Sequence, residues 1–442
     1  INLYKLWRYC MDLMSKLKQV LPVSSRSFHS DINQLKSDVD EMQGQLTHIQ
    51  SVLETVHHDV VHESAYYLFA EPGYPNYGDE LIAREWIKYL AERCPTVPVY
   101  LDCARPGPAA AILEGLHPHL VVTDTVARLS HENTAAENDE TTCSIASHVY
   151  DAIDDESQSA RYAAGIRLIR NKTRGAHILG GGWLNSQWKE NLARLAAVDW
   201  FRDNGIPAIG TGLGLVPLDE QDRDYVSKVL SKMNALSCRD TSSRQLLPAD
   251  DNRFTLSVDD CFVNGLDGVY TSKTELPQVM ICVQSDFVQD RDVLMKHVEA
   301  ILQHWQIPEN EEIGIVECMP YGDNPIFYYL RDIGRKVTLF STQSLLDEGF
   351  PAIPGQLWIS TRYHPHLLAA ARGCSGVFIS PDTAYYGVKH QAVLDMGSHW
   401  VNAAIGDPIP QAGNGFEHPD AMVRQYRDAV RASASALYGL SR

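Results

Sequence analysis

The sequence predicts an α/β protein with two Rossmann-like, doubly wound domains that face a cleft, preceded by an N-terminal helical coiled coil. Three observations predict this fold class. Short apolar segments alternate with helical ones from about residue 64, as in parallel βαβ units. The alternation restarts after a turn-rich stretch at residues 263–278, and a sustained apolar repeat precedes it at residues 32–60. We therefore expect three segments, which are N-terminal helices over residues 1–62, a first Rossmann-like domain over 63–270, and a second over 271–442 that ends in a terminal helix.

The N-terminal segment carries apolar residues at alternating steps of three and four. These are Ile32, Leu35, Val39, Met42, Leu46, Ile49, Leu53, Val56 and Val60. A sustained period of about 3.5 predicts a left-handed coiled coil, and hence a homo-oligomer formed through residues 32–60. The number of chains in the oligomer is left open. The alternative is an amphipathic helix that packs on its own domain. Residues 1–21 form another apolar and basic helical stretch, which either packs on the bundle or contacts an anionic membrane surface.

The first domain is expected to have strands within residues 64–71, 97–102, 120–124, 176–181, 206–212, 235–240 and 254–259. A polar, acidic stretch at residues 128–144 has no period and predicts a surface loop. The second domain is expected to have strands within residues 279–286, 313–320, 336–341, 356–362 and 376–380, and helices at 291–305, 325–334, 342–348, 365–372 and 385–396. A long amphipathic helix is expected within residues 418–440. In such a fold, ligands bind beyond the carboxyl ends of the strands.

Charge and cysteine usage limit the function. A net charge of −18 argues against nucleic-acid binding, because phosphate backbones are held by clustered Lys and Arg. The nine cysteines form no C-x-x-C pair and no zinc spacing, which is typical of reduced thiols in a cytoplasmic protein. There is no apolar run of ~18 residues or more that could span a membrane. The chain begins at Ile1 without Met, so a preceding segment or anchor is left open.

Polar and glycine-rich turns follow several strands of the first domain. Asn76, Gly78 and Asp79 open a helix after the first strand, where they either bind an anion or simply cap the helix. The loops at 180–182 and 210–214 are rich in glycine, which lets the backbone approach a ligand or another strand closely. Neither has the G-x-G-x-x-G spacing of a dinucleotide site. Arg239 ends a later strand and either holds a phosphate or forms a surface pair with Asp240.

In the second domain, Arg362 and His364 stand two positions apart at a strand end, so on a strand they would share one face. Pro365 suits the first position of a helix, which makes His364 the expected N-cap. The pair is either an anion site above a helix N-terminus or a polar hinge. Tyr386 and Lys389 follow the next strand and add a further cation.

Taken in order, these motifs resemble the polysaccharide pyruvyl transferase family over roughly residues 65 to 400. The resemblance rests on Asn76, Gly78, Asp79, Gly180, Gly181, Gly182, Gly212, Gly214, Arg239, Asp240, Arg362, His364, Tyr386 and Lys389. Members of that family resemble GT-B glycosyltransferases in having two Rossmann-like domains, and they move the enolpyruvyl group of phosphoenolpyruvate onto a sugar as a cyclic ketal. The sequence departs from the family where Leu215 follows Gly214, since members often have proline there.

The resemblance implies that the first domain faces the sugar acceptor and that Arg362 and His364 lie at the phosphoenolpyruvate site. It also suggests that Arg239 and Lys389 bind the phosphate and carboxylate. Ketal formation needs a general acid and several cations. His364 suits the first role because imidazole titrates near neutral pH, and Arg362 and Arg239 suit the second as anion clamps. Asp79 is our hypothesis for the base that receives the proton of the acceptor hydroxyl.

The remaining expected contacts with substrate are made by Asn76, Gly78, Gly181, Gly182, Gly212, Tyr386 and Lys389. We expect phosphoenolpyruvate as donor, a glycan or glycolipid as acceptor, no metal and no cofactor. Two alternatives stay open. One is a GT-B glycosyltransferase that uses a nucleotide sugar, for which Asp382 is the only acidic candidate to hold the ribose. The other is a non-catalytic coiled-coil assembly protein, which would be expected to lack the Arg and the His.

Overall fold

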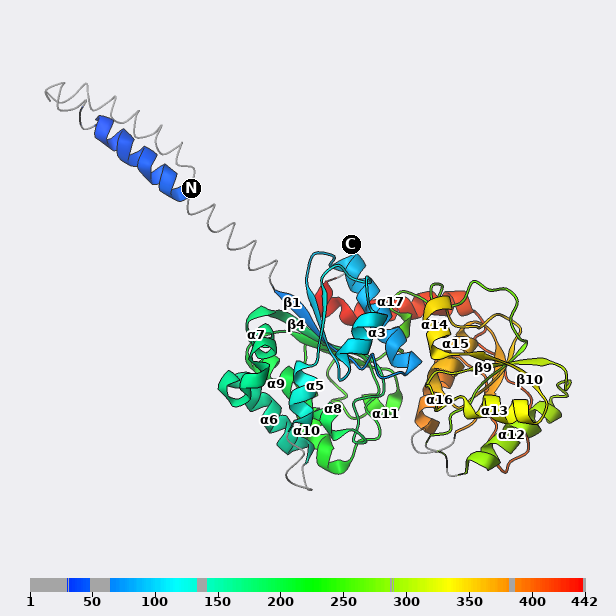
Figure 1. Ribbon diagram of the computed structural model, residues 1–442. Coiled ribbons are helices and arrows are strands. Elements are labelled where there is room, and N and C mark those ends of the chain that lie inside the picture. Colours follow the sequence, from blue (N-terminus) through cyan, green and yellow to red (C-terminus); the bar gives the residue numbers. More distant parts are fainter. Residues whose placement is uncertain are drawn as a thin grey trace. The chain divides into compact units, whose positions relative to one another are not determined.

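The computed structural model describes residues 30, 32–47, 64–132, 141–286, 288, 290–380 and 386–439. The chain divides into two compact units, residues 1–62 and 63–442, and each is treated by itself. Figure 1 shows the ribbon, coloured along the chain. Among the described residues, no helix combines the length and the apolar character needed to cross a membrane.

In the first unit, residues 32–47 form a helix. Three apolar side chains of the expected coiled-coil seam, Leu35, Met42 and Leu46, are exposed on it by 54%, 56% and 46%. The rest of the seam, from Ile49 to Val60, and the expected helix at residues 1–21 lie outside the described residues. The coiled coil therefore stays a prediction, although the apolar face that it requires is present.

The second unit contains two parallel sheets, so the α/β, doubly wound fold class is confirmed. The first sheet has the order β3-β2-β1-β4-β5-β6-β7. Its strands are β1 Ala65–Phe69, β2 Val99–Asp102, β3 Leu120–Thr123, β4 Thr173–Ile178, β5 Ala208–Leu213, β6 Ala235–Cys238 and β7 Phe254–Leu256. Each of the seven expected strands is present.

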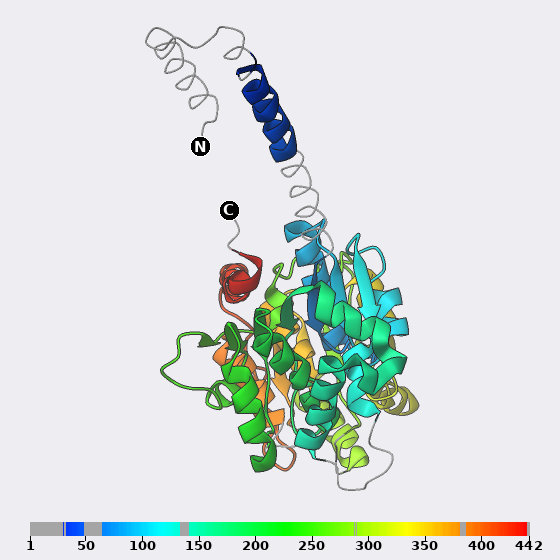
Figure 2. The same ribbon diagram turned by 90° about the vertical axis from the view of Figure 1, so that its left-hand side faces the viewer.

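Both faces of the first sheet are buried, as its uninterrupted apolar strands require. In β1, Tyr66 and Leu68 point into one hydrophobic cluster, whereas Ala65, Tyr67 and Phe69 point into another. Helices cover both faces, as Figures 1 and 2 show. They are α3 Tyr77–Arg93, α4 Pro106–Ile112, α5 Thr125–His131, α6 Thr142–Asp154, α7 Ala163–Lys172, α8 Lys189–Ala193, α9 Leu195–Asp203, α10 Glu220–Ser231 and α11 Thr241–Arg244.

The expected loop at residues 128–144 is wrong at both ends, because α5 runs to His131 and α6 begins at Thr142. The Thr141 side chain caps α6 by accepting a hydrogen bond from Ser144 N at 3.2 Å. Thr141 and Ser144 form a capping box that starts this helix. The helix start was not predicted from the sequence because the stretch is polar throughout.

The second sheet has the order β10-β9-β8-β11-β12-β13. Its strands are β8 Val279–Cys282, β9 Glu312–Val316, β10 Lys336–Phe340, β11 Leu357–Ser360, β12 Ser375–Phe378 and β13 Val401–Asn402. The helices are α12 Arg291–His304, α13 Pro325–Asp332, α14 Thr342–Glu348, α15 Tyr363–Ala371 and α16 Tyr386–Asp395. The sequence predicted all of these except β13, which has only two residues.

The last helix, α17 Pro419–Tyr438, packs on the first sheet although it follows the second in the chain. The hydroxyl of Tyr438 lies 2.9 Å from Nδ1 of the buried His177 on β4. The C-terminal helix therefore ties the two sheets of this unit to each other.

Each sheet reverses its strand order once, between β1 and β4 and between β8 and β11. The loops after these strands diverge to opposite faces of their sheet, and such switch points are where doubly wound folds bind ligands. They carry the Asn76 motif, the 180–182 glycines, Gln284 to Asp286, and Arg362 with His364.

Candidate active site

The N-terminus of α3 forms one wall of the site. The Asn76 side chain accepts a hydrogen bond from Gly78 N at 3.3 Å and donates one to Asp79 Oδ2 at 2.8 Å. Asn76 thus serves as the helix cap that the sequence allowed. The neighbouring Tyr77 N donates to Cys318 O at 2.8 Å, which joins this helix start to the loop after β9 in the second sheet.

Asp79 lies in an environment that favours its neutral form. Burial raises its pKa to about 6; Glu71 adds to the rise, while the nearby His364 and Arg239 oppose it. A carboxyl group with a pKa near neutrality can exchange protons at working pH, as a general base must.

His364 is the second residue of α15, and the N-cap is Arg362. The expected N-cap at His364 is therefore wrong. Helical backbone angles already begin at Tyr363, and Pro365 is tolerated at the third position because the first-turn N–H groups have no intrahelical partner. As a result, His364 projects from the first turn of the helix instead of sharing a strand face with Arg362.

Within residues 63–442, we call the part built on the first sheet the first half and the part built on the second sheet the second half. The His364 ring contacts the first half at two places. Its Nε2 lies 3.4 Å from Asp259 Oδ1. Its other edge, with Nδ1, lies so close to Gly78 that a Cβ there would overlap the ring. The site is thus assembled from both halves, because His364 belongs to the second and Gly78 and Asp259 belong to the first.

Asp259 is a site residue that the sequence reasoning missed. It is fully buried and accepts hydrogen bonds from Arg239 Nη1 at 2.8 Å and from Cys261 N at 3.0 Å. Burial alone would raise its pKa, but the charge and hydrogen bond of His364, together with Arg239, hold the pKa below the ordinary value for Asp. The signal was the pair Asp259-Asp260 at the end of the expected strand segment 254–259, at the carboxyl edge of the sheet.

Arg239 lies at the centre of the cationic part of the site. It is only 6% exposed, and its guanidinium stacks 4.4 Å from the centre of the Tyr363 ring. A Cβ added to Gly182 would lie 2.9 Å from Arg239 Nη2 and 3.7 Å from Lys389 Nζ. The structure therefore brings Gly182, Arg239 and Lys389 together.

Two cations close to Lys389 influence its titration. Burial lowers the pKa of the Lys389 ammonium well below its ordinary value, and the charges of Arg239 and Arg362 lower it further. An anion bound beside these three side chains would favour the charged ammonium.

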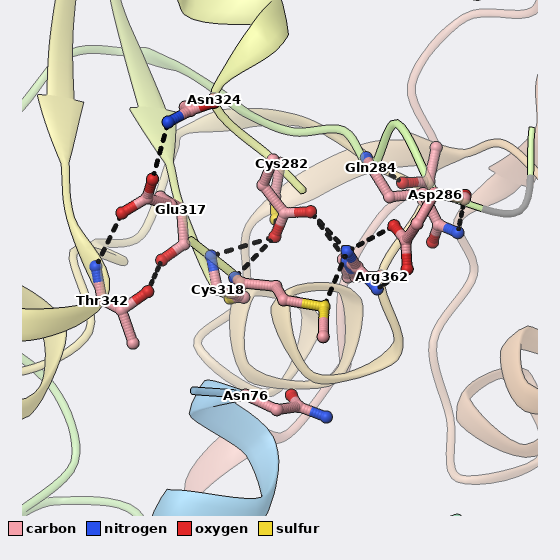
Figure 3. A network of polar contacts seen from close by, with 12 residues as sticks. Asn76, Cys282, Gln284, Asp286, Glu317, Cys318, Asn324, Thr342 and Arg362 are labelled. Carbon is pink, nitrogen blue, oxygen red and sulfur yellow. Dashed lines mark hydrogen bonds and ion pairs between the residues drawn. The ribbon is translucent and has the colours of Figure 1, made fainter. Parts of the chain in front are cut away.

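Arg362 is held by two carboxylates of its own half, as Figure 3 shows from close by. Its Nη2 lies 2.7 Å from Asp286 Oδ1 and 2.6 Å from Asp323 Oδ1, and its Nε donates to Asp323 at 2.9 Å. Asp323 is fully buried and also accepts from the backbone N–H groups of Cys318 and Met319. The guanidinium is therefore fixed in position, and Asp286, whose side chain is 30% exposed, is its more accessible partner.

The second glycine loop packs on another buried acid, Asp260. Gly212 has φ +54°, and a Cβ there would lie 2.6 Å from Asp260 Oδ1, so only glycine fits. The Oδ2 atom of Asp260 accepts hydrogen bonds from Gly180 N at 2.8 Å, Thr211 Oγ1 at 2.6 Å and Trp86 Nε1 at 2.7 Å. Asp260 thus links both glycine loops. Gly181 adjoins this junction with φ +130°.

Most of the residues expected at the site converge. Asn76, Gly78, Asp79, Gly181, Gly182, Gly212, Arg239, Arg362, His364 and Lys389 all lie in the contacts described above. Tyr386 is the first residue of α16, but its side chain lies outside the described part of the chain. One group in that part, Cys282, Cys318 and Asp323, has the proximity of metal ligands, yet both oxygens of Asp323 already accept hydrogen bonds.

Comparison with known proteins gives a family. A family model described as polysaccharide pyruvyl transferase matches residues 76–336. No curated protein matches the chain. Among solved structures, a putative UDP-N-acetylglucosamine 2-epimerase from Listeria monocytogenes has 10% identity and a TM-score of 0.48, over 86% of this chain and 91% of that one. Phytolacca americana UGT2, complexed with UDP-2fluoro-glucose and pterostilbene, has 12% identity and a TM-score of 0.44, over 85% and 97%.

These structural likenesses concern the chain path alone. The family match instead spans the cap at Asn76, both glycine loops, Arg239 and Asp259, which are the residues that the first half contributes to the site. The match runs from β2 to β7 of the first sheet and on through β8 and β9 of the second. It covers more than half of the chain, and on this basis the chain belongs to the polysaccharide pyruvyl transferase family.

Proposed function

We propose that the protein transfers the enolpyruvyl group of phosphoenolpyruvate to a sugar of a polysaccharide, or of its precursor, and forms a pyruvyl ketal. The observation that carries the proposal is that Arg239 and Lys389 lie beside the bare backbone of Gly182, and that Arg239 shares the carboxylate of Asp259 with His364. One ionisable imidazole and several cations are what a phosphorylated enol requires.

The donor is a small polyanion, whereas the chain as a whole carries a net charge of −18. Local cations must overcome that field. Arg239 and Lys389 lie together near Gly182, and we assign them to the phosphate and carboxylate of the donor. We assign Arg362 to the same anion. On binding it, Arg362 gives up its contact with Asp286 and keeps its contact with Asp323.

His364 acts as the general acid and Asp79 as the base. His364 gives a proton to the methylene carbon of the enol, which becomes a methyl group and leaves an oxocarbenium-like centre at C2. A sugar hydroxyl adds to C2 and loses its proton to Asp79. Phosphate then leaves with the electrons of its C2–O bond, and a second hydroxyl closes the ring on C2 and gives its proton to the departing phosphate. The proton on Asp79 returns through solvent to His364. The products are one ketal and one phosphate, and the step needs no oxidant, reductant or metal ion.

We further propose that the acceptor is a glycan or glycolipid, and that copies of the chain associate through residues 32–60. The exposed Leu35, Met42 and Leu46 support self-association, since a heptad seam is buried only against a partner helix. Sedimentation equilibrium of the full chain should show an oligomer that Leu35→Ser with Met42→Ser dissociates. A protein that is monomeric at micromolar concentration would exclude the proposal. We also propose a cytoplasmic location, with residues 1–21 at a membrane surface.

The decisive experiment is incubation with phosphoenolpyruvate and a panel of galactosides, glucosides and mannosides, with the ketal methyl group detected by mass spectrometry and NMR. His364→Ala should abolish the product while its circular dichroism matches the wild type. If no sugar is modified, and UDP or GDP rather than phosphoenolpyruvate raises the melting temperature, the protein is a nucleotide-sugar enzyme instead.

A further inference from the structure

Asp259 connects two site residues that come from different halves of the molecule. It is completely buried three residues beyond the end of β7, where it accepts a hydrogen bond from Cys261 N at 3.0 Å and caps a short 3₁₀ turn, Asp260–Phe262. One of its oxygens also faces Arg239 Nη1 at 2.8 Å, and the other faces His364 Nε2 at 3.4 Å. The carboxylate is therefore shared between a cation of the donor site and the imidazole of α15.

Contact with a carboxylate decides which ring nitrogen carries the proton. Because an ionised carboxylate only accepts hydrogen bonds, Nε2 of His364 must be protonated when it faces Asp259. The second titrating nitrogen is then Nδ1, on the opposite edge of the ring. A buried aspartate that orients a catalytic histidine and stabilises its imidazolium in this way is the arrangement of the serine-protease triad.

The rest of the first half fixes the same helical turn. The ring of Tyr363 lies 4.4 Å beneath the Arg239 guanidinium, and His364 lies against the Cα atom of Gly78. Tyr363 is thus held by Arg239, which also binds Asp259. His364, the next residue of α15, fits against Gly78 because glycine leaves room for the imidazole.

We propose that Asp259 is a positioning residue of the reaction, which holds His364 in the Nε2–H form and couples its orientation to Arg239. The proposal rests on the function above only in that His364 is the acid. Asp259 does not touch the reacting atoms. It acts through the imidazole, so its removal changes kcat more than the KM for phosphoenolpyruvate.

Asp259→Asn tests the proposal, because no orientation of the amide serves both partners. If the amide nitrogen faces Arg239, two donors meet, and if it faces Cys261 N and His364, the acceptor for Nε2–H is lost. We expect kcat to fall ~100-fold, as for loss of an oriented acid. The double variant with His364→Ala should lose no more activity than His364→Ala alone, since residues that act as a unit are not additive.

A second readout does not depend on turnover. In protein labelled with ¹⁵N-histidine, the ring-nitrogen shifts of His364, assigned by their absence in His364→Gln, should report a protonated Nε2. Asp259→Asn should change them. Gly78→Ala, which displaces the ring and leaves Asp259 intact, should do the same even if Asp259→Asn does not fold.

Asp222→Asn is the matched control, because Asp222 is also buried and accepts one side-chain hydrogen bond, from Ser186 at 2.6 Å. Its histidine spectrum and activity should match the wild type. Unchanged ring-nitrogen shifts in both test variants would overturn the proposal whether or not a ketal is formed. A changed tautomer in a protein that makes no ketal would instead uphold the positioning role and defeat the proposed reaction.

Discussion

Gly78 on α3 and the imidazole of His364 on α15 lie so close that no side chain fits between them. We predict that Gly78→Ala leaves the protein folded and lowers pyruvyl transfer at least ~100-fold, because the ring must turn away from Asp259. Overpacking a buried contact costs about 1–3 kcal/mol, which the helix preference of alanine offsets only in part, so the melting temperature should fall modestly while the protein stays folded. Steady-state kinetics and a thermal melt check both parts.

Gly107→Ala is the control for this prediction. Gly107 also lies in a helix, α4, and a Cβ there would meet nothing within 4 Å. This variant should gain helix propensity and keep full activity. Equal activity of the two alanine variants would show that the Gly78 contact has no part in the reaction.

The backbone of Gly182 gives the second prediction. A Cβ at this position would lie 2.9 Å from Arg239 Nη2, and the buried guanidinium is held by Asp259 and stacked on Tyr363. Gly182→Ala should therefore raise the KM for phosphoenolpyruvate about tenfold or more, which corresponds to ~1.4 kcal/mol of lost binding. Gly268→Ala, with nothing within 4 Å, should leave it unchanged. If Gly182→Ala and Gly268→Ala have the same KM for phosphoenolpyruvate, Arg239 does not bind the donor.

The pH dependence of the reaction is the third prediction. The pKa of Asp79 is raised by burial to about 6, and a base acts only when ionised. Thus kcat/KM should rise as the pH increases through about 6, and it should fall again at higher pH, where the general acid His364 loses its proton. Asp79→Asn should abolish the rising limb together with most of the activity. A rising limb that persists in Asp79→Asn would assign the base to another group.

The fourth prediction concerns stability around Arg362. Asp323→Asn would place an amide N–H₂ against the guanidinium or the backbone donors, and breaking a buried ion pair costs about 3 kcal/mol or more. The measurement is the free energy of unfolding in urea. The comparison variant is Asp332→Asn, whose pair with Arg331 is exposed on both sides and should contribute under ~1 kcal/mol. Similar losses for both would mean that Arg362 does not depend on Asp323.

The sequence predicted the parts of this fold that depend on local apolar pattern. Strands such as Val279–Cys282 are short apolar runs with clear turns around them, and both sheets were expected from them. β13 has two residues and no such run. The start of α15 was misplaced because Pro365 prefers the first helical position but also fits the third, and the choice depends on the loop that precedes it.

Site residues could be predicted where a single stretch of sequence contains the motif. Contacts between residues that are far apart in the sequence could not be predicted. Gly78 and His364 were each singled out, but their contact joins residues 286 positions apart. Asp259 was the last residue of an expected strand segment, residues 254–259, and was not singled out. Asp286 and Asp323, which hold Arg362, follow different strands, so spacing could not reveal that the expected anion clamp already has two carboxylates. The catalytic roles themselves stay predictions.

The last prediction follows from Asp260, whose pKa is raised by burial from 3.8 to about 7. Between these values the folded protein keeps a proton that the unfolded chain has released, so this group stabilises the fold at low pH. That contribution is lost as the pH rises towards about 7. The buried His177, whose pKa burial lowers to about 3, acts in the opposite direction, because its neutral form is favoured in the fold.

Comparison with Asp260→Asn separates the two effects. The free energy of unfolding of the wild type minus that of the variant should decrease by up to about 1.4 kcal/mol per pH unit between pH 4 and 7, the limit for one proton. Urea unfolding followed by tryptophan fluorescence at several pH values measures this difference. The exposed Asp250→Asn removes a surface carboxyl group and should overlay the wild type. A difference independent of pH would mean that Asp260 is already ionised beside Thr211 and Trp86, and that its hydrogen bonds, rather than a retained proton, hold the two glycine loops together.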